Sequence, residues 1–405
     1  MRNVVLMTFD ACRKDVLGCY GVEKNLTPFI DSLRERLLLF TRAQATGPYT
    51  QASFPSILTS SYYLEYGWQQ KCPSQRIFLS EILKEAGIAT AAFHSNPYLC
   101  GYFGWNRGWD FFMDSMKDPV TPKVPFLKGD KINRRVETWL SSQKKIGKNN
   151  PFFIWVHYMD THEPYIPDRE YLKLVHPDLD ISEEKMFLLF KEVLLKRDVS
   201  DLNNIELLKK LYHAHVREVD AYAKDFFGIL ESQDLLDDTT VIITSDHGDE
   251  FGEHGGLSHD DKLYSELVDV PLLFYGPGIK GGTECRSLVS NIDIPPTILH
   301  LFGLGPVAAF KGQSLLPIES YSNVGCFGEA IHQIKGKGGD ISRDVYFYRE
   351  EDLKIIYRAD QDSWEMYDLL ADPRETVNIV EISSMADGLK SKLLPHVRRW
   401  EKNFN

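Results

Sequence analysis

The sequence lacks any apolar run long enough to cross a membrane, and its cysteines lack the spacing of a metal ribbon. Among the 405 residues no stretch of about 18 apolar residues occurs, so we expect neither a membrane-spanning helix nor a membrane partner. Internal repeats and low-complexity tracts are also absent. No two cysteines form a CxxC pair, so we expect buried or incidental thiols rather than a disulfide framework or a zinc ribbon; the cysteines are Cys12, Cys19, Cys72, Cys100, Cys285 and Cys326.

Basic residues are outnumbered in this chain. Lys and Arg total 46 against 58 Asp and Glu, which gives a formal net charge of −12. Such a charge repels polyanions at long range, so nucleic acid is not an expected partner. An anionic substrate stays compatible with this charge, because a metal ion and a few histidines reverse the potential locally. The apolar run Val4–Met7 is too short for a signal-peptide core, so we expect a cytoplasmic protein.

Four short apolar runs of buried-strand character each stop at a polar cluster. Helical patterns such as Thr27–Leu38 and Ile77–Ala86 lie between them. This alternation predicts an α/β fold with a large, mostly parallel mixed sheet and helices on both faces. Ligands of such sheets gather at the carboxyl ends of the strands, so we expect the polar clusters to meet in one crevice. The runs are Asn3–Phe9 before Asp10, Ile88–Phe93 before His94, Phe152–Val156 before His157, and Thr239–Thr244 before Ser245.

The length of the chain predicts a large domain and a smaller one. We expect a catalytic domain over residues 1–318 and a small C-terminal α+β subdomain over residues 319–405. Residues 168–217 are charged and helical in period, and they form either a cap near the crevice or a solvated helical excursion. In the C-terminal part we expect the strands Val345–Arg349 and Leu353–Arg358, followed by a helix over Met385–Phe404.

A metal site is predicted where the fourth apolar run ends. Asp246 and His247 stand side by side before Gly248, which permits the sharp turn that two ligands of one ion require. Asp10 ends another strand and supplies a third ligand. The alternative is an ordinary helix-capping aspartate beside a surface histidine.

A reactive hydroxyl is predicted at Ser53. Pro55 suits a first helical turn, so Ser53 is expected at a helix N-terminus, where free N–H groups and the dipole favour an oxyanion. A neighbouring metal ion would further favour the alkoxide. Taken alone, the serine is better explained as a simple helix cap, and only its combination with the candidate metal ligands favours the nucleophile.

Four polar side chains are candidates for contact with the substrate. His162 and His259 are expected to contact its outer oxygens or to protonate the leaving group. Asn96 is a candidate polar contact, and Lys262 would add positive charge. Each of these residues also has an ordinary interpretation as a solvated surface group.

The combination of motifs resembles sulfatases of the alkaline phosphatase superfamily over nearly the whole chain. The catalytic motifs that carry this resemblance are Phe9-Asp10-Ala11-Cys12-Arg13, Ser53-Phe54-Pro55-Ser56, His157-Tyr158-Met159-Asp160-Thr161-His162-Glu163-Pro164-Tyr165, Ser245-Asp246-His247-Gly248 and Gly252-Glu253-His254-Gly255. Later segments are similar too: Val270-Pro271-Leu272, Asp293-Ile294-Pro295-Pro296-Thr297, Gly312-Gln313-Ser314-Leu315, Met366-Tyr367-Asp368-Leu369 and Asp372-Pro373-Arg374-Glu375. The resemblance implies an alkaline-phosphatase-like fold.

It also implies a role for each matching residue. Asp10, Asp246 and His247, with an oxygen of Ser53, would hold one divalent ion. Calcium is common in the family, whereas an Asp/Asp/His set suits manganese or zinc. Ser53 occupies the nucleophile position, which many relatives oxidise to formylglycine. His162 and His259 fall where relatives bind or protonate the transferred group.

Three positions depart from the family pattern. Ala11 replaces the second of two adjacent aspartates, and Ile57 replaces an arginine that helps the maturation enzyme to recognise the serine or cysteine. The lysine-rich substrate motif of many arylsulfatases is replaced by Phe93-His94-Ser95-Asn96-Pro97. Ser53 is therefore considered both as formylglycine and as unmodified serine, and aryl sulfates are not singled out as substrates.

The predicted function is metal-dependent hydrolysis of a sulfate ester on a small molecule or a glycan. The alternative is a phosphomonoesterase, phosphodiesterase, phosphonate monoester hydrolase or phosphotransferase with unmodified Ser53. Its two-metal form would take further ligands from Asp160, His162 and His259. A non-catalytic binding protein is the third reading. The alcohol part of the substrate and the oligomeric state are left open, because Trp105, Arg107 and residues 168–217 carry no readable specificity code.

Overall fold

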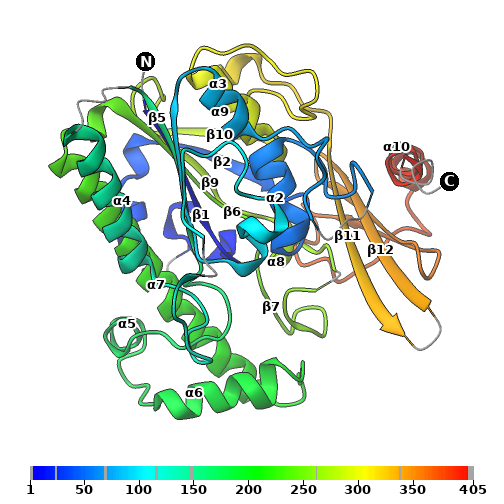
Figure 1. The fold of residues 1–405 in the computed structure, drawn as a ribbon. Coiled ribbons are helices and arrows are strands. Elements are labelled where there is room, and N and C mark those ends of the chain that lie inside the picture. Colours follow the sequence, from blue (N-terminus) through cyan, green and yellow to red (C-terminus); the bar gives the residue numbers. More distant parts are fainter. Residues whose placement is uncertain are drawn as a thin grey trace.

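A mixed sheet of eight strands forms the centre of the protein (Figure 1). The structure is a computed structural model that describes residues 3–22, 25–67, 71–114, 117–145, 150–260, 262–336 and 339–399. The strand order is β10-β2-β9-β6-β1-β5-β3-β4. The strands are β1 (Asn3–Phe9), β2 (Leu37–Gln44), β3 (Ala89–Phe93), β4 (Phe111–Phe112), β5 (Phe152–Tyr158), β6 (Thr239–Ser245), β9 (Leu272–Tyr275) and β10 (Thr283–Ser290).

Most neighbouring strands are parallel, as predicted. Strand β9 is the exception, because it runs antiparallel to both β2 and β6. Strand β1 lies between β5 and β6 and is parallel to both, with Phe9 opposite Tyr158 on one side and Ser245 on the other. The carboxyl ends of these three strands are therefore level, and the residues that follow them meet at one edge of the sheet.

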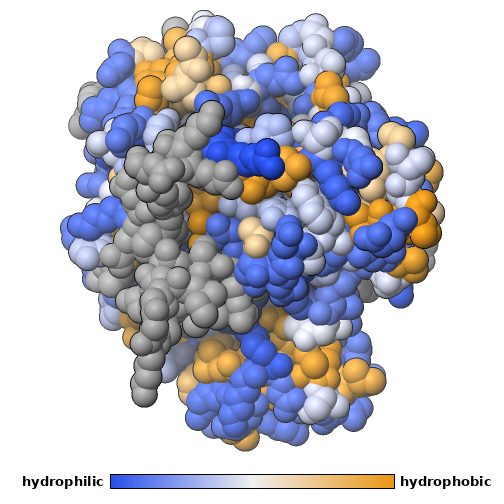
Figure 2. Space-filling model, turned by 90° about the vertical axis from the view of Figure 1, so that its right-hand side faces the viewer, coloured by the Kyte–Doolittle hydropathy of each residue, from blue (hydrophilic) through white to orange (hydrophobic). Residues whose placement is uncertain are grey.

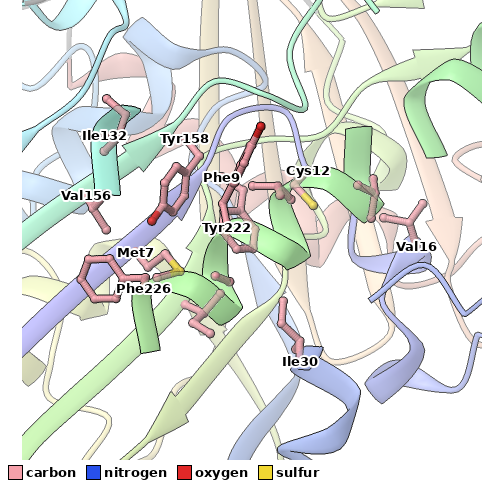
Figure 3. Close-up of a cluster of buried hydrophobic side chains, with 14 of the residues drawn as sticks. Met7, Phe9, Cys12, Val16, Ile30, Ile132, Val156, Tyr158, Tyr222 and Phe226 are labelled. Carbon is pink, nitrogen blue, oxygen red and sulfur yellow. The ribbon is translucent and has the colours of Figure 1, made fainter. Parts of the chain in front are cut away.

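Helices cover both faces of the sheet. Successive side chains of β1 point to opposite faces and are apolar on both, so each face is buried in its own hydrophobic cluster. Met7 and Phe9 belong to the cluster drawn in Figure 3, together with Tyr158 of β5 and Tyr222 of α7. Val4 and Leu6 belong to the cluster on the other face. On the first face lie α1 (Pro28–Ser32), α4 (Gly129–Lys145) and α7 (Leu202–Ser232); on the second lie α2 (Thr50–Thr59), α3 (Leu79–Glu85), α8 (Ser265–Val268) and α9 (Ile294–Leu301).

The predicted helical insertion forms a lobe at one end of the molecule (Figure 1). It consists of α5 (Arg169–Val175), α6 (Glu183–Leu189), a π-helical turn (Phe190–Leu194) and the first half of α7. Arg197 of this lobe donates hydrogen bonds to the backbone carbonyls of Leu257 and His259. The lobe therefore contacts the loop that carries one of the predicted site residues. Figure 2 shows hydrophobic patches on it; its exposed leucines are Leu174, Leu188, Leu195 and Leu202.

The C-terminal part contains a separate four-stranded antiparallel sheet of order β11-β12-β13-β14. One face of this sheet packs against the main domain through side chains such as Phe347 and Ile356. The other face holds α10 through Tyr346, Ile355 and Leu393. The elements are β11 (Cys326–Gly336), β12 (Gly339–Glu350), β13 (Leu353–Arg358), β14 (Ser363–Asp368) and α10 (Ala386–Arg398). The α+β character is as predicted, while the boundary at residues 318 and 319 stays a prediction.

Two of the predicted helices differ from those observed. The expected helix Thr27–Leu38 is wrong beyond Ser32: a short 3-10 turn follows, and β2 begins at Leu37. A short apolar run has no periodicity that separates a buried strand from a helix, which explains this error. Helix α2 begins at Thr50, so Ser53 lies in its first turn rather than before it. The predicted residues 400–404 of the last helix lie outside the described residues.

Other expectations from composition agree with the structure. All six cysteines are free thiols. Within the described ranges, every helix is too short or too polar to span a bilayer. The cytoplasmic location stays a prediction.

Removing a buried leucine from α10 tests how the C-terminal sheet is held. Leu393 is fully buried against β12 and β13, so Leu393→Ala should lower the free energy of unfolding by about 2–5 kcal/mol in urea denaturation. The matched control is Leu370→Ala, because Leu370 is 80% exposed and its loss should change this free energy by less than about 0.5 kcal/mol. Equal effects of the two variants would contradict the packing described.

Candidate active site

Three predicted metal ligands lie together where β1 and β6 end. Asp10 follows β1 directly, and Asp246 and His247 follow β6. All three are completely buried. One donor atom from each lies within 4.8 Å of the other two, so the residues form a group that could hold a metal ion.

Asp10 is oriented by His157 of β5 and by Asn96, which lies in the turn after β3. Its Oδ2 accepts a hydrogen bond from Asn96 Nδ2 at 2.9 Å and lies 3.0 Å from His157 Nε2. Thr8 Oγ1 lies 2.8 Å from Nδ1 of His157, and a hydroxyl hydrogen donated there leaves the Nε2 hydrogen for Asp10. Burial opposes ionisation of Asp10, but the neighbouring His162 and the hydrogen bond with His157 lower its pKa overall. Its other oxygen, Oδ1, has no hydrogen-bond partner.

The orientation of His247 is fixed by a backbone carbonyl. His247 Nδ1 lies 2.9 Å from the carbonyl oxygen of Gly248, which can only accept, so Nδ1 carries the hydrogen. Burial and the neighbouring His259 lower the pKa of His247 to about 3, which keeps the ring neutral. The lone pair of Nε2 therefore remains free, 3.6 Å from Asp10 Oδ1 and 3.5 Å from Asp246 Oδ2.

The three converging atoms fit a divalent cation. Asp10 Oδ1, Asp246 Oδ2 and His247 Nε2 are buried and have no hydrogen-bond partner in the part of the chain that the structure describes. Electron-rich atoms that face one another without a proton repel each other, and a bound cation converts this repulsion into attraction. Burial and the Asp10 charge raise the pKa of Asp246 well above its ordinary range. A metal ion at this point would favour ionisation of both carboxylates.

Ser53 lies next to this group. Its Oγ donates a hydrogen bond to the backbone carbonyl of Asp246 at 2.6 Å, and the side chain is completely buried. Its own N–H is bonded to the carbonyl of Tyr49, so the free amides expected at a helix N-terminus belong to residues preceding Ser53. The structure thus brings the predicted nucleophile to the predicted metal ligands.

His162 and His259 form the more exposed side of the site. Their ring centroids lie 5.0 Å apart, and the His259 ring lies 4.5 Å from that of His247. Nδ1 of His259 lies 2.8 Å from a carboxylate oxygen of Asp249. Burial disfavours the cation, but the Asp249 charge prevails and raises the pKa of His259 to about 9. A protonated His259 gives the site positive charge at neutral pH, as recognition of an anionic ester requires.

Two predicted residues make their polar contacts inside the protein. The Lys262 ammonium group is bonded to both carboxylate oxygens of Glu250, at 3.1 and 2.8 Å, and to the carbonyl of His254. Its positive charge is therefore already balanced within its own loop, and its contact with substrate stays a prediction. Asn96 holds Asp10 and caps the turn at Tyr98.

Asp160, which was considered as a ligand for a second metal, faces away from the group. Its carboxylate accepts the N–H of Gly129 at the start of α4, at 3.1 and 3.3 Å. Within the described part of the chain it belongs to none of the residue groups that could hold a metal. This placement leaves the second metal site without one of its three proposed ligands.

Several supporting residues were not singled out from the sequence. His157 positions Asp10, Thr161 donates to the Asp10 carbonyl, and Asp249 orients His259 while accepting from Tyr165. His157 ends a strand like the predicted ligands, and this signal was available. The pairing of Asp249 with His259 is not readable from spacing, because it depends on how the intervening loop folds.

The loop that carries His259 is attached to the C-terminal sheet. This loop contains the short antiparallel strands β7 (Glu250–Phe251) and β8 (Leu257–Ser258). Within it, the His254 ring stacks on Tyr264 with centroids 3.6 Å apart. Glu375 accepts the N–H of Ser265 at 2.6 Å and is paired with Lys354 at 2.9 Å, with both charged side chains completely buried. The C-terminal part thus fixes one wall of the site.

Comparison with known proteins follows this geometry. The model of the sulfatase family matches residues 2–304, three quarters of the chain. The chain belongs to the sulfatase family. A second model, described as the C-terminal region of N-sulphoglucosamine sulphohydrolase, matches residues 252–402. This sulfatase is therefore a sulfuric ester hydrolase, as predicted, and family membership implies a metal ion.

Curated relatives extend along most of the chain. Arylsulfatase K of Canis lupus familiaris is 32% identical over 93% of this chain and 78% of its own length. Arylsulfatase K of Mus musculus is 26% identical over 96% of the chain and 78% of its own length. N-acetylglucosamine-6-O-sulfatase of Bacteroides thetaiotaomicron is 24% identical over 93% of the chain and 82% of its own length.

Solved structures confirm the predicted fold. One is a protein in complex with its substrate D-glucosamine-2-N,6-O-disulfate, with a TM-score of 0.79, 21% identity, and coverage of 99% of this chain and 98% of the other. Another is the phosphonate monoester hydrolase of Agrobacterium radiobacter, with a TM-score of 0.77, 20% identity, and coverage of 99% and 96%. At these identities the likeness concerns the fold.

Replacing one carboxylate tests the metal site. Asp246→Ala should remove bound metal, measured by elemental analysis after dialysis, and should lower turnover by about 10²–10³-fold or more, since charge stabilisation at the reacting centre is lost. Asp160→Asn is the control: it changes a buried carboxylate outside the group and should keep the metal. Wild-type metal content and activity in Asp246→Ala would contradict the assignment.

Breaking the buried ion pair tests the attachment of the loop. Lys354→Met leaves Glu375 buried without its cation, so the free energy of unfolding should fall by about 3–5 kcal/mol in chemical denaturation. Lys84 and Asp110 form a half-exposed pair, and Lys84→Met should cost at most about 1 kcal/mol. A similar small cost for both variants would show that the pair does not hold the loop.

Proposed function

We propose that this sulfatase hydrolyses a sulfate ester of a saccharide with one divalent cation held by Asp10, Asp246 and His247 beside Ser53. The observation that supports the proposal is the convergence of three buried donor atoms without hydrogen-bond partners. When bound, the cation would supply positive charge that stabilises the nucleophile oxygen and the charge developing on the transferred group. Manganese and zinc suit this donor set, and calcium is the alternative.

The protein's own residues supply positioning and proton transfer. His157 and Asn96 hold Asp10 in place, and the Gly248 carbonyl holds His247 in the tautomer that leaves Nε2 free. His259, protonated beside Asp249, would bind the anionic group of the substrate. His162 or His259 would give a proton to the departing alkoxide, which is a much poorer leaving group without it.

Ser53 would act in one of two forms. As formylglycine it supplies a geminal diol, which offers one hydroxyl for attack and a second for releasing sulfate. As unmodified serine it needs a water molecule to release the transferred group. Ile57, at the position where relatives carry arginine, is completely buried in the hydrophobic core, so it offers a maturation enzyme no charged contact in the folded chain.

The proposed alcohol is a sugar. One curated relative is named an N-acetylglucosamine-6-O-sulfatase, and one structural relative holds a glucosamine disulfate as its substrate. Both relatives span nearly the whole chain, which supports a saccharide sulfate ester as the substrate class for this chain.

Hydrolysis of a phosphonate or phosphate monoester is the second candidate. It is favoured by the buried Ile57, because an unmodified serine suits phosphoryl transfer at least as well as sulfuryl transfer. Its support from structure is limited to the shared fold with the phosphonate monoester hydrolase.

The mass of the peptide that contains Ser53 separates the two forms. The peptide is released from the purified protein by proteolysis and its mass is measured. A loss of two hydrogens from this peptide is the result expected for a formylglycine sulfatase. Ser53→Ala should then lose turnover of a saccharide sulfate while keeping the metal, because the three other ligands remain. An unmodified serine combined with faster hydrolysis of phosphonate monoesters than of sulfates would overturn the sulfate assignment.

A further inference from the structure

A cavity of about 180 Å³ lies beside α2 and is not used by the chemistry described above. We call it the α2 pocket. It is bordered by the first two turns of α2 and by the segments around residues 71–76 and 98–105. The residues that line it are Gln51, Pro55, Tyr63, Gly67, Lys71, Cys72, Pro73, Arg76, Tyr98, Phe103 and Trp105.

The pocket contains a buried cation. Arg76 is only 2% exposed, yet its guanidinium forms no salt bridge within the described ranges of the chain. Its hydrogen bonds go to neutral oxygens: the hydroxyls of Thr59 and Ser61 and the backbone carbonyls of Tyr62 and Tyr63. Among the residues that the structure describes, its Nε–H has no hydrogen-bond partner.

Two carboxylates whose charges act on Arg76, those of Glu65 and Glu329, are paired with other cations. Glu65 is paired with Lys311 at 3.1 Å. Glu329 is paired with His396 at 2.9 Å and with Arg399 at 3.2 Å. A buried guanidinium without a counter-ion is unfavourable, and burial accordingly lowers the pKa of Arg76. An anion bound in the pocket would supply the missing charge.

A second cation and several aromatic rings complete the pocket. The Lys71 ammonium lies 4.3 Å from the ring centroid of Tyr102, and within the described residues it is paired with no carboxylate. Tyr98 is 52% exposed, while Phe103 and Trp105 form an apolar wall. Aromatic walls with a few charged groups are typical of sites that take the apolar face of a ring and fix its polar substituents.

The pocket begins close to the reacting centre. Gln51 lies two residues before Ser53 in the same helical turn, which is about 3 Å along the axis. On the other side, the Tyr98 N–H donates to Asn96, and Asn96 donates in turn to Asp10. A substrate with its ester at Ser53 would therefore meet the pocket with an adjacent part of the same sugar or with the next one.

We propose that the α2 pocket binds a second anionic group of the substrate, through Arg76 and Lys71, while a sulfate ester of the same saccharide is cleaved at Ser53. The anion is a second sulfate or a uronate carboxylate, which share the same recognition chemistry. This inference rests on the proposed function and narrows it to saccharides with more than one negative group.

The test compares pairs of substrates that differ by one anion. The full chain is assayed with D-glucosamine-6-O-sulfate and with D-glucosamine-2-N,6-O-disulfate, and then with 6-O-sulfated disaccharides that carry or lack a uronate carboxylate. The wild type should prefer the more anionic member of at least one pair, and that pair identifies the anion. The ratio to compare is kcat/KM for the more anionic substrate divided by kcat/KM for the less anionic one. In Lys71→Gln this ratio should fall about tenfold, because one charged contact is lost. The fall should come from KM.

Two controls keep the result interpretable. Lys84→Gln removes an exposed lysine of α3 that is paired with Asp110. This variant should leave the kcat/KM ratio within the substrate pair unchanged. Arg76→Lys keeps the buried positive charge but loses the planar guanidinium group, so a folded variant should show a lower kcat/KM ratio. Lys71→Gln changes an exposed residue and leaves the core as it is. An unchanged ratio in Lys71→Gln, or no preference in the wild type for either pair, would overturn the proposal.

Failure of the proposed function would look different. If the wild type hydrolyses none of these sulfates, binding of D-glucosamine-2-N,6-O-disulfate to wild type and Lys71→Gln is measured by calorimetry. About tenfold weaker binding by the variant would still support the pocket, and equal binding would overturn it.

Discussion

The site depends on one electrostatic constraint, the burial of two carboxylate oxygens and an imidazole nitrogen that face one another and have no hydrogen-bond partner among the described residues. Asp10 Oδ1, Asp246 Oδ2 and His247 Nε2 share this position. Asn96, His157 and the Gly248 carbonyl hold Asp10 and His247 in this arrangement. The packing of β1 between β5 and β6 maintains it, and the donor set fits a cation.

The same constraint explains how the surroundings are built. His157 and Asn96 satisfy one oxygen of Asp10, so only the other oxygen is left for a metal. Asp249 keeps His259 cationic on the outer side, where an anionic ester would approach. Glu375, which is paired with Lys354 of β13, accepts the N–H of Ser265 next to the loop that carries His259, so the C-terminal part helps to position this loop.

Much of this architecture could be predicted from the sequence, because it follows from local patterns. The strand Asn3–Phe9 was predicted with its observed limits, since a continuous apolar run that ends at Asp10 has few other interpretations. The metal ligands followed from strand ends and from the family motifs. The start of α2 could not be predicted, because Pro55 tolerates an interior position there. The lack of a salt bridge to Arg76 could not be predicted either, because it depends on which cations lie next to Glu65 and Glu329 in the folded chain.

The order of the strands also has a consequence for how the chain acquires its activity. His157 lies 147 positions after Asp10, and Asp246, whose carboxylate accepts the Ala11 N–H, lies 235 positions after Ala11. A ribosome must therefore release more than half of the chain before Asp10 can meet Asp246 and His247. Contacts of such long separation form slowly, because the entropy of closing the intervening loops is lost first. The nascent N-terminal half can form helices and strands, but it cannot bring the three candidate metal ligands together before Asp246 and His247 have been made.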